Sequence, residues 1–299
     1  SVYTLKPEDF HSIIPKLTIK VGGKVKAGEA VFYNKANDAM KFPSPVSGEL
    51  VDIIRGEKRK ILEIKIQASE TQEYADFGVK QPTNMSGEEI KAHLLASGCW
   101  PFIKQRPYDV IADTAKTPKA IFVSAYASAP LAADYDYVLK GKENELQTAI
   151  TALSKLTSGT VHVSIGKKSN SPLAGLSNCS IHKVSGPHPS GNVGTQIAKI
   201  NPINKGETVW TISPQDLVII GELLLTGKFN PERTIALAGS SVKKPIYFTT
   251  KIGVSINALI KDKLASDNCR VISGNVLTGK AQNIKGALGY YDNLVTVIP

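Results

Sequence analysis

The chain has 299 residues, 42% of them hydrophobic and 21% charged, and a formal net charge of +10 at pH 7. This length exceeds one ordinary core and the composition excludes a largely disordered chain, so we expect two or three packed domains. Residues 150–299 hold 16 of the 36 basic and 7 of the 26 acidic residues, so +9 of the charge lies in the second half.

A basic excess of this size favours an anionic partner, which can be nucleic acid, an acidic lipid surface or an acidic protein face. The basic pairs at 167–168 and 243–244 have few aromatic neighbours, and no RNP, KH or zinc-finger pattern accompanies them. We therefore expect no nucleic acid. Docking on a protein or membrane surface is the favoured interpretation, and an ordinary solvated surface is the alternative.

No apolar stretch reaches the ~20 residues that a membrane-spanning helix needs, because Glu222 interrupts the nearest one, Leu217 to Thr226. No transmembrane segment is therefore expected. The chain begins at Ser1 without an initiator Met or a signal-peptide pattern, so we expect a fragment of a longer protein.

The cysteines Cys99, Cys179 and Cys269 stand 80 and 90 residues apart, with no C-x-x-C pair and no histidine at ligand spacing. This pattern predicts no metal site and no iron–sulfur cluster in the chain. An odd, sparse set of cysteines indicates reduced thiols in a cytoplasmic compartment, and we expect all three to be small buried side chains.

Residues 17–67 alternate short β-rich runs with glycine turns, which predicts a small all-β sandwich or barrel. The segments G-x-V-x-x-G at 23–28 and S-P-V-S-G-x-L at 44–50 resemble the biotinyl/lipoyl carrier fold, so residues 1–70 are predicted as such a domain. Carriers hold an acceptor lysine at a hairpin tip between these segments. Neither Lys35 nor Lys41 has the expected E-[AT]-[MD]-K context, so we expect the fold without its acceptor; a lipoyl or biotinyl adduct is the alternative.

Residues 71–205 are predicted as a Rossmann-like α/β domain that follows a polar linker at 68–85. Ser86 and Glu89 have the spacing of a capping box, which starts a helix that ends at Gly98. The next expected elements are a strand at 120–125, a helix at 143–156, a strand at 160–165 and a strand at 179–184. Strand, crossover helix and strand predict a right-handed βαβ unit in a largely parallel sheet.

Residues 206–299 are predicted as a β-grasp (SLBB-like) domain with a preceding helix. Ser213 and Pro214 are typical of a helix start, and Gly227 of its end. The next expected elements are strands at 234–238, 245–250, 270–273 and 294–298 and a short helix after Ser255. The chain as a whole is thus predicted as an α+β and α/β multidomain protein.

Three glycine-containing segments lie on the three predicted units, at 43–48 (P-S-P-V-S-G), 186–194 (G-P-H-P-S-G-N-V-G) and 270–279 (R-V-I-S-G-N-V-L-T-G). The second segment contains Gly186, Pro187, His188, Pro189, Gly191 and Gly194. Its glycines are expected to set the backbone conformation, and phosphate binding is the alternative. No G-x-G-x-x-G follows a strand, which disfavours an independent dehydrogenase.

With I-I-R-G-E-K-R (53–59), G-C-W-P-F-I-K-Q-R-P-Y (98–108), A-I-F-V-S-A (120–125) and L-L-L-T-G (223–227), the second segment closely resembles the A subunits (NqrA) of the Na⁺-translocating NADH:quinone oxidoreductases. The resemblance covers nearly the whole chain in order. More distantly, the chain is similar to the C subunit of the Rnf complex and to the flavin-binding subunit of complex I.

The resemblance implies a peripheral subunit on the cytoplasmic face of the bacterial inner membrane, without catalytic residues of its own. The implied partners are quinone and the membrane subunits of the Nqr complex, especially NqrB; NADH and quinone are used by the whole complex. The flavin-binding relatives have a G-R-G-G-A-G-F-P-T-type loop, where this chain has the bulky residues and two prolines of 99–108. We therefore expect neither a flavin nor an iron–sulfur centre in this chain.

Four residues have suitable chemistry for a quinone or other ligand: Trp100, Phe102, Arg106 and His188. Ordinary core packing is the alternative for the aromatic residues, and a hydrogen bond that shapes the loop is the alternative for His188. The competing function is a free-standing carrier or a module that holds a small ligand in its β-grasp domain.

Overall fold

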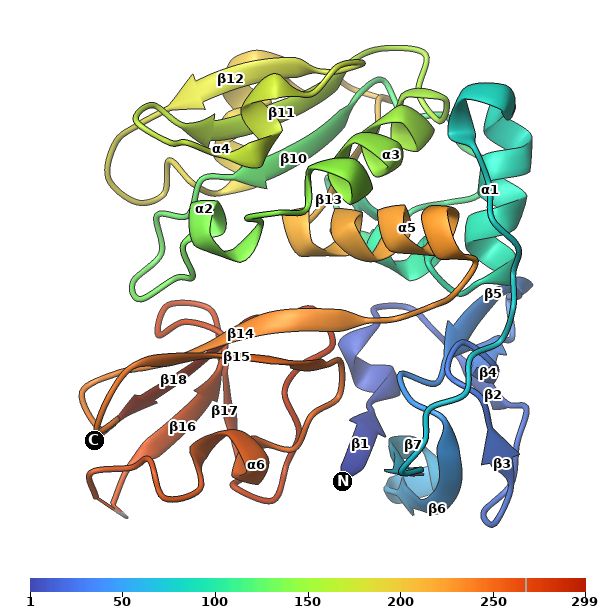
Figure 1. Ribbon diagram of the computed structural model, residues 1–299, viewed down its shortest axis with the longest axis vertical. Coiled ribbons are helices and arrows are strands. Elements are labelled where there is room, and N and C mark those ends of the chain that lie inside the picture. Colours follow the sequence, from blue (N-terminus) through green and yellow to red (C-terminus); the bar gives the residue numbers. More distant parts are fainter. Residues whose placement is uncertain (267) are drawn as a thin grey trace.

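The computed structural model describes residues 1–266 and 268–299. The chain folds into three units, and the α/β unit lies across the two others, which stand side by side below it in Figure 1. The unit formed by the N-terminal residues contains two antiparallel sheets, ordered β1-β7-β6-β3 and β2-β4-β5. Its strands are β1 (Val2–Leu5), β2 (Pro15–Leu17), β3 (Lys24–Val25), β4 (Ala30–Asn34), β5 (Asn37–Pro43), β6 (Gly48–Arg55) and β7 (Ile61–Ala68).

Alternation of apolar and polar residues explains the two sheets of this first unit. Along β7, Ile61, Ile64 and Ile66 turn inward while their neighbours are more exposed. The buried rings of Phe32 and Phe42, which face each other across β4 and β5, stack at 4.5 Å. The predicted all-β unit is therefore confirmed.

The central unit contains a six-stranded sheet in the order β12-β11-β10-β13-β8-β9. Its strands are β8 (Lys104–Arg106), β9 (Val110–Ile111), β10 (Ile121–Ala125), β11 (Val161–Gly166), β12 (Ser180–Val184) and β13 (Val209–Ile212). Its helices are α1 (Gly87–Ala96), α2 (Tyr135–Val138), α3 (Glu143–Ser154), α4 (Val193–Ile200) and α5 (Pro214–Thr226). Strands β10 to β13 run parallel, and β8 and β9 extend the sheet in antiparallel fashion.

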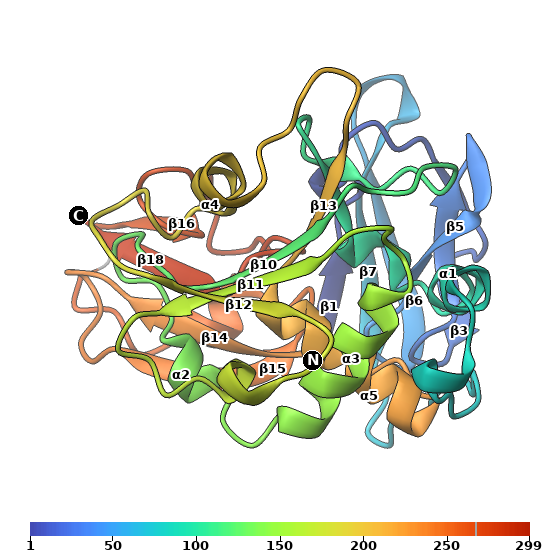
Figure 2. The ribbon, with the colours of Figure 1, turned by 90° about the horizontal axis from the view of Figure 1, so that it is seen from above.

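Helices cover both faces of this sheet. Seen from above in Figure 2, α4 lies on one side of the strands, and α3 and α5 lie on the other. Ile197 of α4 packs against Phe122 of β10 and Val209 of β13, which are all buried. The chain runs from β10 to β11 and β12, then returns through α4 to β13 on the other side of β10. The order of the strands therefore reverses between β10 and β13.

The third unit contains a five-stranded sheet in the order β15-β14-β18-β16-β17 with one short helix. Its elements are β14 (Glu232–Ala238), β15 (Ile246–Lys251), α6 (Ile256–Ile260), β16 (Arg270–Ser273), β17 (Lys280–Gln282) and β18 (Leu294–Ile298). The 3-10 helices among the described residues are η1 (Pro7–Asp9), η2 (Glu57–Arg59), η3 (Pro82–Asn84), η4 (Trp100–Phe102) and η5 (Pro172–Gly175). Helix α6 packs its buried residues Ile256, Leu259 and Ile260 against the sheet, which confirms the expected mixed unit.

The predicted division at residues 205 and 206 needs a correction, because β13 and α5 lie in the central unit. Strand β13 pairs in parallel with β10, and its four residues are all buried. A short apolar strand of this kind is most stable where helices cover both faces of a parallel sheet. Helix α5 packs on α3, so the central unit extends to the end of α5.

The three units share buried contacts. Tyr290, which follows β17, packs on Phe10 of the first unit and on Phe102 of the central unit. Arg233 of β14 forms a buried ion pair with Asp216 of α5, and both side chains are only 3% exposed. The third unit has an apolar cluster of its own, but these buried contacts join it to the two other units.

Candidate functional site

A cavity of about 640 Å³ opens where the strand order reverses, and we call it the switch-point cavity. The segments after β10 and β13 line it, together with the first residues of α4 and α5 and two side chains of β8. In open α/β sheets, ligands bind outside the carboxyl ends of the strands at this position. The volume lies in the range of small-molecule sites.

The glycine-rich loop at 186–194 forms one wall because it packs closely on the segment after β10. A Cβ on Gly191 would lie 2.5 Å from both Tyr126 O and Ser128 N, so only glycine fits there. Gly191 N donates to Ser128 Oγ at 2.8 Å, and Tyr126 Oη donates to Gly186 O at 3.0 Å. These contacts fix the loop in front of α4.

The N-terminus of α4 points its first residues into the cavity. Asn192 is the N-cap, yet within the described residues its side chain forms no capping hydrogen bond, and the first turn has no acidic residue. The N–H groups of Val193 and Gly194 have no partner within the helix, so they are available to an acceptor in the cavity, whereas Thr195 N donates to Asn192 O at 3.0 Å. A Cβ on Gly194 would meet no atom closer than Arg106 Nη1, at 3.8 Å.

The opposite wall carries two cations on β8, held there because β8 pairs antiparallel with β13. Lys104 Nζ lies 3.9 Å from the centre of the Tyr291 ring and 4.0 Å from Asp109 Oδ2. Burial lowers the pKa of Lys104, and Asp109 opposes that shift. Arg106 Nε lies 3.2 Å from Asp109 Oδ1.

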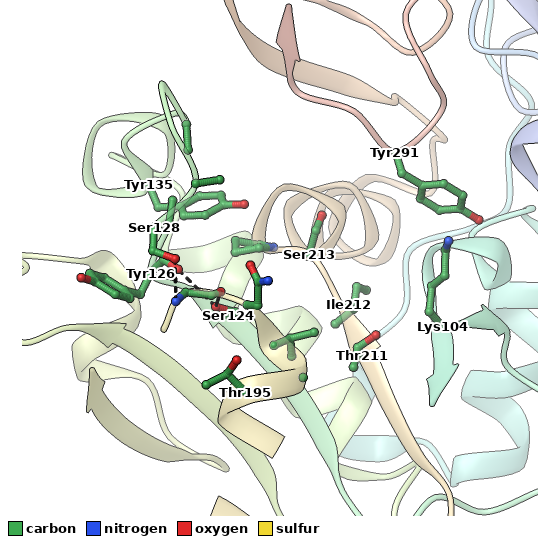
Figure 3. A pocket seen from close by; sticks show the side chains of 18 of the residues that line it. Lys104, Ser124, Tyr126, Ser128, Tyr135, Thr195, Thr211, Ile212, Ser213 and Tyr291 are labelled. Carbon is green, nitrogen blue, oxygen red and sulfur yellow. Dashed lines mark hydrogen bonds between the residues drawn. The ribbon is translucent and has the colours of Figure 1, made fainter. Parts of the chain in front are cut away.

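Tyr291 reaches the cavity from the third unit. Its hydroxyl donates to Pro101 O at 2.7 Å, and burial raises its pKa well above the usual value, so the phenol stays neutral. Figure 3 shows Lys104 and Tyr291 facing each other at one end of the cavity, with Ser124, Ser128 and Thr195 at the other. We call the end formed by Lys104 and Tyr291 the aromatic end, and the other the hydroxyl-rich end, which Tyr126 and Tyr135 also border.

Several of the predicted site residues come together in the cavity. Its lining includes Phe102, Arg106, Pro189, Gly191 and Gly194. Gly186, Pro187 and His188 do not line it. His188 Nδ1 lies 3.1 Å from Ser128 Oγ in the same loop contact.

Trp100 lies outside the cavity, in the core. It is fully buried, its Nε1 donates to Ala112 O at 2.8 Å, and its ring meets Trp210 edge to face at 5.3 Å. These contacts are those of a packing residue. Phe102 is also buried, but it reaches the wall of the cavity.

Lys104, Ser124 and Tyr291 line the cavity but were not predicted from the sequence. Lys104 stands two residues before Arg106, and side chains two apart on a strand share a face, so that signal was available. No local signal links Tyr291 to this site, because it comes from another unit.

Two further observations concern metals and membranes. In residues 1–266 and 268–299, no three His, Cys, Asp or Glu side chains gather as a metal-ion site. None of the helices in that part of the chain combines the length and the hydropathy needed to cross a bilayer.

Comparison with protein families matches all three units. Residues 1–69 match the NqrA N-terminal barrel-sandwich hybrid domain, residues 85–229 the NqrA second alpha/beta domain, and residues 234–283 the NqrA C-terminal (SLBB) domain. The chain belongs to the NqrA family. The end of the second match at residue 229 agrees with the placement of β13 and α5 in the central unit.

Curated NqrA relatives are similar over 97% of this chain, and each is named as the A subunit of Na⁺-translocating NADH-quinone reductase. Identity is 37% for Neisseria meningitidis strain Z2491, 36% for Marinomonas sp. MWYL1 and 36% for Haemophilus influenzae Rd. The chain spans 65–66% of the length of these relatives.

Among solved structures, a chain of NAD⁺-reducing NiFe hydrogenase in the H2-reduced state aligns with 61% of this chain and 41% of its own length. The identity is 13% and the TM-score 0.43. The fold assignment therefore rests on the NqrA domain matches and on the topology.

Proposed function

We propose that the chain is a peripheral subunit of a Na⁺-translocating NADH:quinone reductase, which couples respiratory electron transfer to sodium export. The observation that carries the proposal is the similarity to NqrA relatives over 97% of the chain. In this proposal it sits on the cytoplasmic face of the bacterial inner membrane, docks on the membrane subunits, especially NqrB, and contributes to quinone interaction and assembly. The isolated chain has no catalytic activity of its own.

The proposed subunit holds neither a flavin nor an iron–sulfur centre, while the whole complex uses NADH and quinone. The segment that replaces the glycine loop of flavin-binding relatives supports this part of the proposal. Residues 99–103 are all buried in the core, so their bulk occupies space that a glycine loop would leave open. Purified chain that retained a yellow flavin in stoichiometric amount would contradict the proposal.

The switch-point cavity is the proposed place for a quinone headgroup. A quinone needs an apolar slot with donors for its carbonyl oxygens. Phe102, Ile212 and Tyr291 offer apolar surface in the lining, and Lys104 offers an ammonium donor. Arg106 stands beside it on the same strand and can serve the second carbonyl.

A titration with a short-chain ubiquinone tests this site. We expect saturable shifts of the backbone amide resonances at residues 104–106 and 211–213. The Lys104→Met variant should bind the quinone about tenfold more weakly, because a charged hydrogen bond is lost. Lys116→Met, which removes an exposed lysine outside the lining, is the matched control. If K104M and K116M bind the quinone with equal affinity, or if the natural chain binds no quinone, the proposed quinone site is wrong.

A specific observation favours one alternative function, a carrier. Lys35 lies exposed in the two-residue turn between β4 and β5, at the hairpin tip where carriers hold their acceptor lysine. Lys41 lies within β5. Intact mass of chain expressed with lipoyl and biotinyl ligases distinguishes the two functions: an adduct on Lys35 supports the carrier, and an unmodified chain removes it.

A further inference from the structure

The hydroxyl-rich end of the switch-point cavity offers a different chemistry from its aromatic end. We infer that this end is a subsite for the phosphate group of a small phosphorylated ligand, a mononucleotide whose ring extends toward Tyr291. The inference goes beyond the proposed function and does not depend on quinone binding.

Positive groups converge on this end from two sides. Arg106 projects from β8, and its Nη1 lies 3.8 Å from the place that a Cβ of Gly194 would take. Its Nε is buried and forms no hydrogen bond within the described residues, although Asp109 Oδ1 is 3.2 Å away in poor alignment. A guanidinium with unused donors that lines a cavity is suited to bidentate binding of a phosphate.

The wall opposite Arg106 supplies neutral donors. Within the described residues, the N–H groups of Val193 and Gly194 at the start of α4 have neither an intrahelical partner nor a capping side chain, and Gly194 leaves room for close approach of an oxyanion. Thr195 adds a hydroxyl group at the same end (Figure 3), whereas Ser128 Oγ already accepts from Gly191 N and contacts His188 Nδ1. Phosphate oxygens accept several such bonds at once.

The charge of the lining favours an anion. The charged side chains that line it are Lys104, Arg106, Asp109 and Asp216. Asp216 is neutralised by Arg233, which donates to its carboxylate in the core. Asp109 offsets one cation and is half exposed, so one positive charge and the partial charge of the α4 terminus remain.

The cavity is large enough, and extended enough in shape, to hold a ligand larger than a free phosphate ion. A phosphate fills a small part of about 640 Å³, and the remainder leads past Thr211 and Ile212 to the Tyr291 ring. Aromatic and aliphatic side chains at that end suit a planar ring. The location at the strand-order reversal is also where α/β sheets hold nucleotides.

Binding of phosphorylated and unphosphorylated partners tests the subsite in the absence of quinone. The probes are adenosine 5′-monophosphate and uridine 5′-monophosphate, each beside its nucleoside form, and inorganic phosphate, titrated against the full chain by calorimetry and amide shifts. We expect at least one nucleotide to bind about tenfold or more tightly than its unphosphorylated form, with shifts at residues 193–195 and weaker binding at high salt.

Three variants separate the subsite from general charge effects. Arg106→Gln should weaken nucleotide binding about tenfold and leave the nucleoside unaffected. Gly194→Ala should weaken it too, because the new methyl group fills the cradle while alanine favours the helix. Lys199→Gln, at the far end of α4, removes the same charge outside the cavity and should have no effect.

Each outcome decides the inference. If inorganic phosphate binds as tightly as the nucleotides, the site is for the free ion and the mononucleotide assignment is wrong. The phosphate subsite is overturned if each nucleotide binds with the same affinity as its nucleoside, or if neither nucleotide binds. It is also overturned if R106Q and K199Q bind the nucleotide with equal affinity while thermal melting shows that both variants are folded. The separate titration with ubiquinone tests the quinone site independently of these outcomes.

Discussion

The buried ion pair between Asp216 and Arg233 joins the central unit to the third unit. Removal of either charge should change the free energy of unfolding by an amount that measures this contact. Asp216 lies in the first turn of α5, and Arg233 on β14 also donates to Tyr290 O. Burial raises the pKa of Asp216 and Arg233 opposes that rise. The two charges are buried away from water, and each neutralises the other. Removal of one partner leaves an unpaired buried charge, which lowers the free energy of unfolding by far more than the intact pair raises it.

We expect Asp216→Asn to lower the free energy of unfolding by about 3–5 kcal/mol, since the guanidinium stays charged in the core and cannot lose its proton. Asp216→Asn combined with Arg233→Met should restore most of the stability, to within roughly 1–2 kcal/mol of the natural chain, because no charge remains buried. Urea unfolding followed by circular dichroism measures each variant.

Arg233→Met alone should behave differently, because Asp216 can take up a proton. Without its partner, the folded-state pKa of Asp216 rises further above the unfolded value of about 3.9, so the folded chain binds more protons. Stability of this variant should therefore fall as pH rises from about 4 through the folded pKa, and then level off. D216N should lack this added dependence. A loss below about 1 kcal/mol in D216N, or no difference between the pH profiles of the two single variants, would refute the reasoning.

Three further outcomes follow from local geometry. Burial raises the pKa of Cys99 to about 12, so iodoacetamide at pH 8 should label the partly exposed Cys269 and spare Cys99 in the folded chain, as peptide mass spectrometry would show. Gly221→Ala should destabilise by about 1–3 kcal/mol in urea, because its Cβ would lie 1.9 Å from a backbone oxygen of α3, whereas the control Gly175→Ala meets open space. Ser86→Ala should cost about 1 kcal/mol by loss of the capping box, measured in the same way.

The sequence by itself determined many of the helices and strands, but α4, β8 and β13, which line the cavity, were not predicted. Ser86 and Ser213 cap α1 and α5 as predicted, and Gly227 ends α5 in a left-handed conformation. The period of the apolar residues placed α3, β10 and β11 within one or two residues of their ends. These signals are local, because a cap or a glycine acts through hydrogen bonds and sterics within one turn of chain.

Part of the candidate site was also visible in the sequence. Arg106 and the glycines of the 186–194 loop were singled out by residue type, and the structure brings Arg106, Gly191 and Gly194 together in one cavity. Trp100 was singled out on the same grounds and lies in the core instead. Residue type alone does not distinguish a buried aromatic that packs from one that faces a cavity, because burial depends on neighbours distant in sequence.

Only the tertiary structure decided where distant segments meet. Strand β13 lies beside β10, some 85 residues earlier in the chain, because a largely apolar strand is most stable where helices cover both faces of the sheet. That pairing placed β8, α4 and the end of β13 around one cavity and allowed Tyr291 to close it from another unit. The elements are specified by short-range hydrogen bonding and sterics, whereas the cavity is specified by which buried surfaces fit together.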